Sequence, residues 1–487
     1  MGKLIRTSTP LLFQSKLLCS SLSYLFFSLF FAFYTSLSPT TKCHFRSSPF
    51  DPLHAPLFNY PQSYGQHKHP IPTIHSSCNS PVFFSDYSFV FNEIQRLVGN
   101  SSWDSSGLRY VRGNKNGGKF GMNYTTKKRL SYYDYRGDGI EIPCGFLKKF
   151  PISDYDRIAM ESCDGVVVVS AIFGNHDKIR QPRGLGFNTL NHVCFFMFID
   201  EITLKQLYFH NLLSRKTKEN RIGAWRIVEV SSKQLYENPA MNGVIPKYLV
   251  HRLFPNSKYS IWVDAKMQLV VDPLLLLHSL VIVEDVDMAI SKHPLYVHTM
   301  EEAMATARWK KWWDVDSLRI QIETYCEHGL QPWSSKKHPY TSGNSISLHA
   351  GQELEQAGSF GLLAWWASMD WAVAWAVADV PDSAIILRKH GVGNNLFSCL
   401  LFNELEAFNP RDQLPFAFVR DKLNPKIKLN MFDVEVFEHV ASEYRHSIKH
   451  GPTVTQSTKT KKASPSLLAN GGIRTKCDKY LEELWDQ

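Results

Sequence analysis

The sequence predicts an α/β protein in which a doubly wound, mostly parallel sheet follows one N-terminal transmembrane helix. Continuous runs of β-branched and aromatic residues indicate strands that are buried on both faces. A helical pattern separates two of these runs, as in a sheet built from β-α units. Near the N-terminus, an uncharged apolar stretch of about 21 residues is long enough to cross a hydrocarbon layer of about 30 Å.

The apolar stretch covers residues 17–37 and leaves residues 1–16 as a cytosolic tail. Basic residues flank it at Lys3, Arg6, Lys16, Lys42 and Arg46. The positive-inside tendency places the N-terminus in the cytosol and the remaining chain in the lumen. The alternatives are a cleaved signal peptide and, because the first 48 residues are rich in serine and lack acidic residues, an organelle transit peptide. We favour a signal-anchor because the apolar run is longer than a usual signal-peptide core.

Two further features agree with a lumenal body. Sequons begin at Asn100 and Asn123, in polar, loop-like sequence, and predict a glycoprotein. The cysteines outside the anchor are even in number and suit an oxidising lumen, although the sequence does not define their pairing. They are Cys43, Cys78, Cys144, Cys163, Cys194, Cys326, Cys399 and Cys477.

The rest of the chain divides by composition. Residues 38–80 are rich in Pro, Ser and His and predict a stem, and residues 81–158 predict a loop-rich N-terminal lumenal region. We expect one catalytic domain over residues 159–450 and a basic, largely disordered tail over residues 451–487. The net charge of +9 does not predict nucleic-acid binding, because part of the excess lies near the chain ends and no nucleic-acid motif accompanies it.

Four strands are expected within the catalytic domain. Residues 165–173 and 193–199 are continuous apolar runs, residues 223–230 are a weaker candidate, and residues 259–263 end at Asp264. Between the last two, residues 246–254 have apolar residues at helical spacing, with Pro246 expected in the first turn. Ligands of such sheets bind beyond the carboxyl ends of the strands, which directs attention to Asp264 and to the turn after residue 173.

Asp264 is the first candidate for a catalytic residue and a metal ligand. Nucleotide-sugar transferases of the GT-A type place an Asp-x-Asp at the mouth of a buried strand, where a divalent cation meets the diphosphate. Here Lys266 stands in place of the second acid, so its ammonium is expected to bind ligand as a counter-charge. The alternative is that Asp264 only ends its strand in a turn.

The loop after the first strand is the second candidate region. His176 is expected to act as a base, and Asp177, Lys178 and Arg180 are expected to bind ligand. A plain polar turn is the alternative.

A third candidate region opens a helix near the C-terminus. Asp412 is expected to be a catalytic carboxylate, flanked by the ligand-binding residues Arg411 and Gln413. Glu404 and Glu406 are rival carboxylates, and a capping role is the alternative for Asp412.

Several stretches carry a family resemblance, among them SSCNSPVFFSDY, SAIFGNHDKIRQPRGLG, NPAMNGVIPKYLVHRLFPNSKYSIWVDAKMQL and NLFSCLLFNELEAFNPRDQLPFAFVRD. Over roughly residues 49–450 the chain resembles the plant turgor-regulation-defect type of alkaline ceramidase. That family is shared with mucilage-related hexosyltransferases and carries a glycosyltransferase-like domain. The resemblance implies a GT-A-like fold, location in the Golgi membrane as a single-pass type II protein, and hydrolysis of ceramide to a sphingoid base and a fatty acid.

One stretch departs from the family pattern. Residues 343–377 form an apolar, tryptophan-rich insertion, and we interpret it as an intron translated in frame. Removal of a surface-loop insertion is expected to leave the fold intact.

Three functions therefore remain open from the sequence. The resemblance implies an alkaline ceramidase of sphingolipid metabolism and turgor regulation, with a lipid substrate. The residues around Asp264 suit a nucleotide-sugar site, for which the resemblance implies a hexosyltransferase that acts on cell-wall polysaccharide. The Asp-x-Lys departure suits a non-catalytic Golgi protein that binds lipid or glycan.

Overall fold

The computed structural model describes residues 16–37, 53–330 and 379–445. Short gaps lie at residues 54–55, 66–68, 76–77, 79, 81, 83, 101–107, 114–119, 122–123, 136–139, 215–219, 310 and 312–313. The expected insertion at 343–377, the tail at 451–487 and the sequon asparagine Asn123 lie outside the described residues.

The N-terminal apolar stretch forms helix α1, Lys16–Leu37, close to the expected bounds. Among the helices of the described part, none meets the combined length and hydropathy required of a membrane span.

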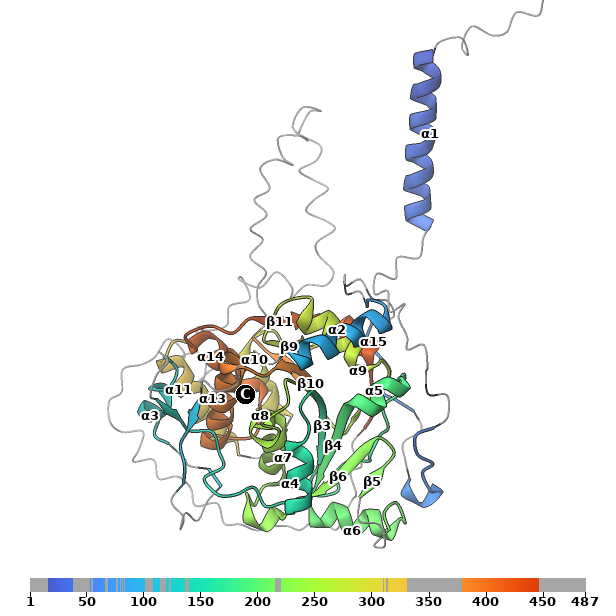
Figure 1. Cartoon of the computed structure of the whole chain (residues 1–487). Coiled ribbons are helices and arrows are strands. Elements are labelled where there is room, and N and C mark those ends of the chain that lie inside the picture. Colours follow the sequence, from blue (N-terminus) through green and yellow to red (C-terminus); the bar gives the residue numbers. More distant parts are fainter. Residues whose placement is uncertain are drawn as a thin grey trace, which may run out of the picture.

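A large mixed sheet forms the centre of the domain (Figure 1). Within the described residues it has eight strands in the order β11-β9-β10-β7-β3-β4-β6-β5. Strands β5 and β10 run antiparallel to their neighbours, and the other pairings are parallel. The strands are β3 Val166–Ile172, β4 Val193–Ile199, β5 Arg221–Ile222, β6 Trp225–Glu229, β7 Tyr259–Val263, β9 Met288–Lys292, β10 Pro381–Lys389 and β11 Leu429–Phe432.

Two small sheets lie beside the large one. Strand β1 (Arg109–Tyr110) pairs with β2 (Glu141–Ile142), and β8 (Met267–Leu269) pairs with β12 (Ala441–Glu443).

Helices cover both faces of the large sheet, as Figure 1 shows. Successive residues of β3 alternate between two hydrophobic cores: Val166 and Val168 belong to one, Val167 and Val169 to the other. The helices are α2 Tyr87–Gly99, α3 Thr126–Leu130, α4 Asp154–Glu161, α5 Phe187–His192, α6 Glu201–Phe209, α7 Pro239–Tyr248, α8 Val250–Leu253, α9 Pro273–Leu277, α10 Thr299–Arg308, α11 Val315–Glu327, α13 Val392–Ala407, α14 Gln413–Lys422 and α15 Val434–Val440. Short helical turns are η2 Gln62–Tyr64, η3 Ser232–Gln234 and the π-helical η4 His278–Ile282. The expected α/β class with a large, mostly parallel sheet is confirmed.

The four expected strands are present as β3, β4, β6 and β7, and β4 and β7 have the expected bounds. The expected helix over 246–254 was wrong in its start. Helix α7 begins at Pro239, because the Asn238 side chain accepts a hydrogen bond from the Ala240 amide and Pro239 suits the first turn. Pro246 therefore lies inside α7, and a second short helix, α8, follows it.

Part of the expected stem packs on the domain. Tyr64 is buried in one of the two cores, and Leu53, Leu57 and Phe58 pack against the same core. Backbone hydrogen bonding from the Leu53 amide to the Leu185 carbonyl at 3.0 Å holds this segment beside the loop that follows β3.

Candidate functional site

Asp264 lies at the carboxyl end of β7, as the sequence predicts. Its amide donates to the Ala384 carbonyl at 2.8 Å, and the Trp262 indole Nε1 donates to its Oδ1 at 2.6 Å. The side chain is 28% exposed, so one side of the carboxylate faces solvent while the other is held by the protein.

The buried side chain of Lys247 joins Asp264 to Asp412. The Lys247 Nζ atom lies 2.7 Å from Asp412 Oδ2 and 3.4 Å from Asp264 Oδ1. It also donates to Ser383 Oγ at 3.1 Å. We call Lys247, Asp264, Ser383 and Asp412 the Lys247 cluster.

The sheet order explains why these four residues meet. Strand β10 runs antiparallel to β7, with Ile385 opposite Val263, so the start of β10 meets the end of β7. Ser383 thereby comes next to Asp264, while α7 supplies Lys247 and the start of α14 supplies Asp412. The carboxyl end of a central strand is where open α/β sheets bind ligands.

Asp412 is held as a carboxylate by its neighbours. Ser383 Oγ and the Tyr248 hydroxyl each donate to Asp412 Oδ2 at 2.9 Å. Burial alone raises the pKa of Asp412, but the Lys247 charge and these hydrogen bonds outweigh burial and leave the pKa below its ordinary value.

The pKa of Lys247 is shifted in the opposite direction. Burial lowers its pKa, but the charges of Asp264 and Asp412 outweigh burial and raise the pKa above its ordinary value. The ammonium therefore stays protonated at neutral and mildly alkaline pH.

Lys266 lies in the turn between β7 and β8 and is paired on its own. Its Nζ atom donates to Glu443 Oε1 at 2.8 Å, and its carbonyl accepts from the Tyr444 amide at 2.9 Å. Burial lowers the pKa of Lys266, but Asp264, Glu443 and Asp382 outweigh it and raise the pKa. The ammonium groups of Lys247 and Lys266 thus both interact electrostatically with the Asp264 carboxylate.

The residues beside Asp412 differ in their surroundings. Asp412 precedes α14 without a side-chain cap hydrogen bond, so its carboxylate serves the Lys247 cluster instead of the helix end. The Arg411 guanidinium is ion-paired with the fully buried Glu302, and Gln413 Oε1 is buried without a hydrogen-bond partner in the described part of the chain.

The rival carboxylates have other partners. Glu404 is buried against the Arg129 Nε atom at 2.9 Å, and Glu406 accepts from the Tyr236 hydroxyl at 2.7 Å.

The loop after β3 is positioned by its backbone. Gly174 and Asn175 have φ values of 70° and 55°, and their amides donate to Asp200 Oδ2 at 2.7 Å and Thr203 Oγ1 at 3.1 Å. The His176 ring folds back over Gly174, where an added Cβ would lie 2.8 Å from its Nε2 atom. Over the described residues no hydrogen bond or ion pair joins His176 to Asp264, and the catalytic role of His176 stays a prediction.

The basic residues of that loop pack on aromatic rings. Lys178 Nζ lies 4.4 Å from the centroid of the Tyr64 ring, and the Arg180 guanidinium carbon lies 3.8 Å from that of Tyr444. Burial is the largest cause of both pKa shifts: it raises the pKa of Tyr64 to about 12 and lowers the pKa of Arg180. The Asp177 charge adds to the first shift and opposes the second. Tyr444 therefore connects Arg180 to the turn that carries Lys266.

Comparison with known proteins identifies the family. The model of the TOD1/MUCI70 glycosyltransferase-like domain matches residues 108–347 and 352–446. The chain belongs to the TOD1/MUCI70 family.

Two curated relatives from Arabidopsis thaliana are similar to the chain. Alkaline ceramidase TOD1 is 54% identical over 502 aligned positions, which cover 100% of both chains. Probable hexosyltransferase MUCI70 is 33% identical over 342 positions, which cover 68% of this chain and 52% of the relative. Among solved structures, mouse xyloside xylosyltransferase 1 in its apo form matches with a TM-score of 0.25 and 7% identity, over 55% of this chain and 85% of that one.

Sequence reasoning missed Lys247, the central residue of the site in this TOD1/MUCI70 chain. The available signal was the lysine in PKYLVHRLF, a segment whose apolar residues have helical spacing. Such a lysine is expected to be paired if it is buried, because an unpaired buried ammonium is costly.

The donor set at Asp264 does not suit a divalent cation in this arrangement. Lys247 Nζ lies at 3.4 Å from its Oδ1, and Lys266 contributes a second positive charge nearby. A hard cation prefers several free oxygen ligands, which the neighbouring ammonium groups oppose. The tentative metal role of Asp264 stays a prediction.

Two cavities lie near other parts of the sheet. One of about 840 Å³ is lined by residues of 149–157 together with Glu201, Asn220, Glu229 and Ser231. The other, of about 520 Å³, is lined by Leu53, residues 56–58, Tyr60, residues 181–185 and Gln268. Gln268 accepts a hydrogen bond from the Tyr444 hydroxyl at 3.0 Å, and the Tyr444 amide donates to the Lys266 carbonyl, so this cavity is connected to the Lys266 turn.

Proposed function

We propose that the chain is an alkaline ceramidase that hydrolyses the amide bond of ceramide to release a sphingoid base and a fatty acid. The observation that carries this proposal is the 54% identity with Alkaline ceramidase TOD1 along the whole of both chains. A membrane lipid substrate agrees with a Golgi protein anchored by α1 as a single-pass type II protein, with the catalytic domain in the lumen.

The geometry at Asp264 supports amide hydrolysis without a metal ion. In the proposed reaction, Asp264 removes a proton from a water molecule that attacks the amide carbon. The Lys266 ammonium stabilises the negative charge that develops on the carbonyl oxygen. The C–N bond then breaks, and the sphingoid amine leaves with the proton. Lys247 and Asp412 hold the Asp264 carboxylate in place.

The 520 Å³ cavity supplies a place for the hydrocarbon chain. Its wall combines the apolar side chains of Leu53, Leu57 and Phe58 with the polar ones of Gln181, Arg183 and Gln268, so that polar and apolar groups share it about equally. The hydrocarbon chain is placed against the apolar side. We expect Leu57→Trp to fill the cavity and to raise KM for long-chain ceramides more than for short-chain ones. An equal effect on both would contradict this placement.

The alternative is transfer of a hexose from a nucleotide sugar. It is favoured by the glycosyltransferase-like domain and by the position of Asp264 at the mouth of β7. In that reaction the ammonium groups of Lys247 and Lys266 take the place of the cation that neutralises a diphosphate. A divalent cation at Asp264 belongs to this alternative and requires displacement of the Lys247 contact.

One pair of assays tests these functions. Full-length protein in detergent is incubated with ceramides across a range of alkaline pH and, separately, with a panel of nucleotide sugars, beside the Asp264→Asn variant. Release of sphingoid base that depends on Asp264 supports the ceramidase. Sugar transfer or nucleotide-sugar hydrolysis without ceramide cleavage overturns it, and binding without either reaction indicates a non-catalytic lipid- or glycan-binding protein.

A further inference from the structure

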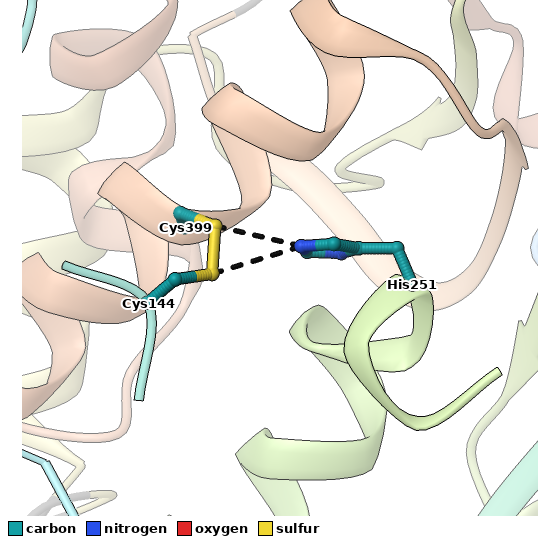
Figure 2. Close-up of side chains that lie close together, drawn as sticks. All are labelled: Cys144, His251 and Cys399. Atoms are coloured by element: carbon teal, nitrogen blue, oxygen red, sulfur yellow. Dashed lines mark hydrogen bonds between the residues drawn. A yellow bond between two sulfur atoms is a disulfide. The ribbon is translucent and has the colours of Figure 1, made fainter. Parts of the chain in front are cut away.

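A histidine lies against a buried disulfide (Figure 2). The His251 Nε2 atom is 3.6 Å from Cys144 Sγ and 3.5 Å from Cys399 Sγ. The three residues come from the segment after β2, from α8 and from α13, and their exposed fractions are 1%, 7% and 0% for Cys144, His251 and Cys399. Their possible ligand atoms lie within 4.8 Å of one another.

These distances suit a common metal ion. In a tetrahedral zinc site, bonds of about 2.3 Å to sulfur and about 2.0–2.1 Å to nitrogen separate the sulfur and nitrogen atoms by about 3.5–3.6 Å. Both Sγ–Nε2 distances already have this value. Only the two bonded sulfur atoms have to separate, to about 3.8 Å for the same geometry.

Positive groups act on the histidine, since the charges of Arg252 and Arg388 both reach His251. A cation at this position therefore needs both thiolates as ligands to offset them. Two thiolates would balance a dication fully and would leave one negative charge on a monovalent ion. The Arg388 guanidinium, whose three nitrogens are buried without hydrogen-bond partners within the described residues, acts electrostatically on His251 and on Asp412.

We infer that Cys144, His251 and Cys399 form a redox-dependent binding site for a thiophilic d10 cation, Zn²⁺ or Cu⁺. A thiol reductant supplies two electrons and two protons to the disulfide and becomes a disulfide itself. The metal ion then displaces the two thiol protons and binds both sulfurs and Nε2. Disulfide and metal exclude each other, because both use the same two sulfur atoms. Because the site is buried, it binds the ion during folding of the reduced chain or through local opening.

The chain provides a matched control. Cys163 and Cys194 form a second disulfide, and these residues belong to no group of possible metal ligands in the described part of the chain. Cys163→Ser/Cys194→Ser therefore removes one disulfide without removing the proposed site, whereas Cys144→Ser/Cys399→Ser removes both ligand thiols.

Metal binding by the full-length protein tests the inference. Protein reduced with a phosphine is incubated with Zn²⁺ or, without oxygen, with Cu⁺, passed over a desalting column and analysed for bound metal by mass spectrometry. We expect one ion per reduced chain, and at least about 100-fold weaker affinity after His251→Asn or Cys144→Ser/Cys399→Ser. The oxidised chain, incubated with the same ions but without reductant, should retain no metal. Whichever cation remains bound at one per chain identifies the ion.

A second measurement separates ligation from folding defects. Co²⁺ bound by two thiolates gives sulfur-to-metal charge-transfer absorption, which we expect from the reduced wild type and from the reduced Cys163→Ser/Cys194→Ser variant. In addition, Zn²⁺ should raise the melting temperature of the reduced wild type but not that of reduced His251→Asn, whose oxidised form serves as the folding reference. Absence of bound metal and of any melting shift in the reduced wild type, or binding that survives His251→Asn unchanged, overturns the inference.

Discussion

The ammonium of Lys247 lies 2.7 Å from the carboxylate of Asp412, and both side chains are buried at the carboxyl end of β7. The contact makes the position of Asp412 depend on α7 as well as on its own helix. Through the same ammonium, Asp412 also influences the solvent-facing Asp264. Stability and the position of the Asp264 carboxylate are therefore coupled at this point of the TOD1/MUCI70 fold.

Removal of the Lys247 charge should be strongly destabilising. We expect Lys247→Met to lower the free energy of unfolding by about 3–5 kcal/mol, because it leaves the buried Asp412 carboxylate without its cation. Urea denaturation of purified protein measures this difference. The double variant Lys247→Met/Asp412→Asn removes the orphaned charge and should recover more than half of the loss. A double variant no more stable than the single one would show that Lys247 acts through packing alone.

Acidification should destabilise the protein through buried histidines. Burial is the largest cause that lowers the pKa values of His293 and His390 to about 4. The unfolded chain then binds more protons than the native one between the unfolded pKa of about 6.5 and the native value, so stability falls as pH drops through this window. At pH 5 the loss is on the order of 2 kcal/mol for each histidine.

Urea denaturation at pH 5 and pH 8 tests this dependence. His390→Gln keeps a polar group near Ser260 Oγ, which lies 2.8 Å from His390 Nε2, and should flatten the slope between the two pH values. An unchanged slope in the variant would show that His390 is not a source of the pH dependence.

The strands that are buried on both faces were predictable from the sequence. Residues 193–199 are apolar throughout, because β4 lies between two strands and is covered on both faces. Strand β10 was not predicted, since its charged ends at Asp382, Arg388 and Lys389 hide the apolar centre. Without β10 the sequence cannot show that Ser383 meets the end of β7.

The site was predictable as separate parts but not as a cluster. Asp264 and Asp412 were expected for different reasons, at a strand end and at a helix start. Their connection through Lys247 depends on non-local packing of α7, α14 and β10, which no local spacing encodes. Adjacency to Asp177 suggested His176 as a base, but the positive φ of Asn175 turns the His176 ring back over Gly174.

The proposed lumenal orientation predicts glycosylation. Asn100 is exposed at the end of α2 and begins one sequon, while the second sequon begins at Asn123. Endoglycosidase treatment of the protein from plant cells should increase its gel mobility, and Asn100→Gln/Asn123→Gln should abolish the shift. A lack of shift together with protease protection of the N-terminus would contradict a type II orientation.

Deletion of residues 343–377 should leave the domain folded. The described sheet, both hydrophobic cores and the disulfide Cys144–Cys399 are assembled from residues outside this segment. The deletion variant is expected to match the full chain in soluble yield and in melting temperature, with removal of a tryptophan-rich apolar stretch favouring yield. Loss of folded protein on deletion, with the full chain folding normally, would show that the segment is structural.

The charge on Asp264 should be required for activity. Asp264→Asn keeps the shape and the Trp262 contact but removes the carboxylate that faces solvent, so we expect a loss of activity of about 10²-fold or more. The melting temperature should change little, because the buried Lys247 keeps its closer partner at Asp412. Full activity of Asp264→Asn towards both ceramide and nucleotide sugars would make Asp264 a turn residue only.

Lys266→Asp separates the two enzyme functions at the same position. The substitution restores an Asp-x-Asp pair and removes the ammonium that Glu443 binds at 2.8 Å, so divalent-cation affinity should rise while ceramide hydrolysis falls. Glu443→Gln is the matched control, since it frees the Lys266 ammonium without adding a carboxylate and should not raise cation affinity. Isothermal titration with Mn²⁺ and Mg²⁺ measures the first effect, and release of sphingoid base measures the second. If Lys266→Asp binds no more cation than wild type and cleaves ceramide at the same rate, Lys266 neither replaces a cation nor stabilises the oxyanion, and the reacting groups lie elsewhere.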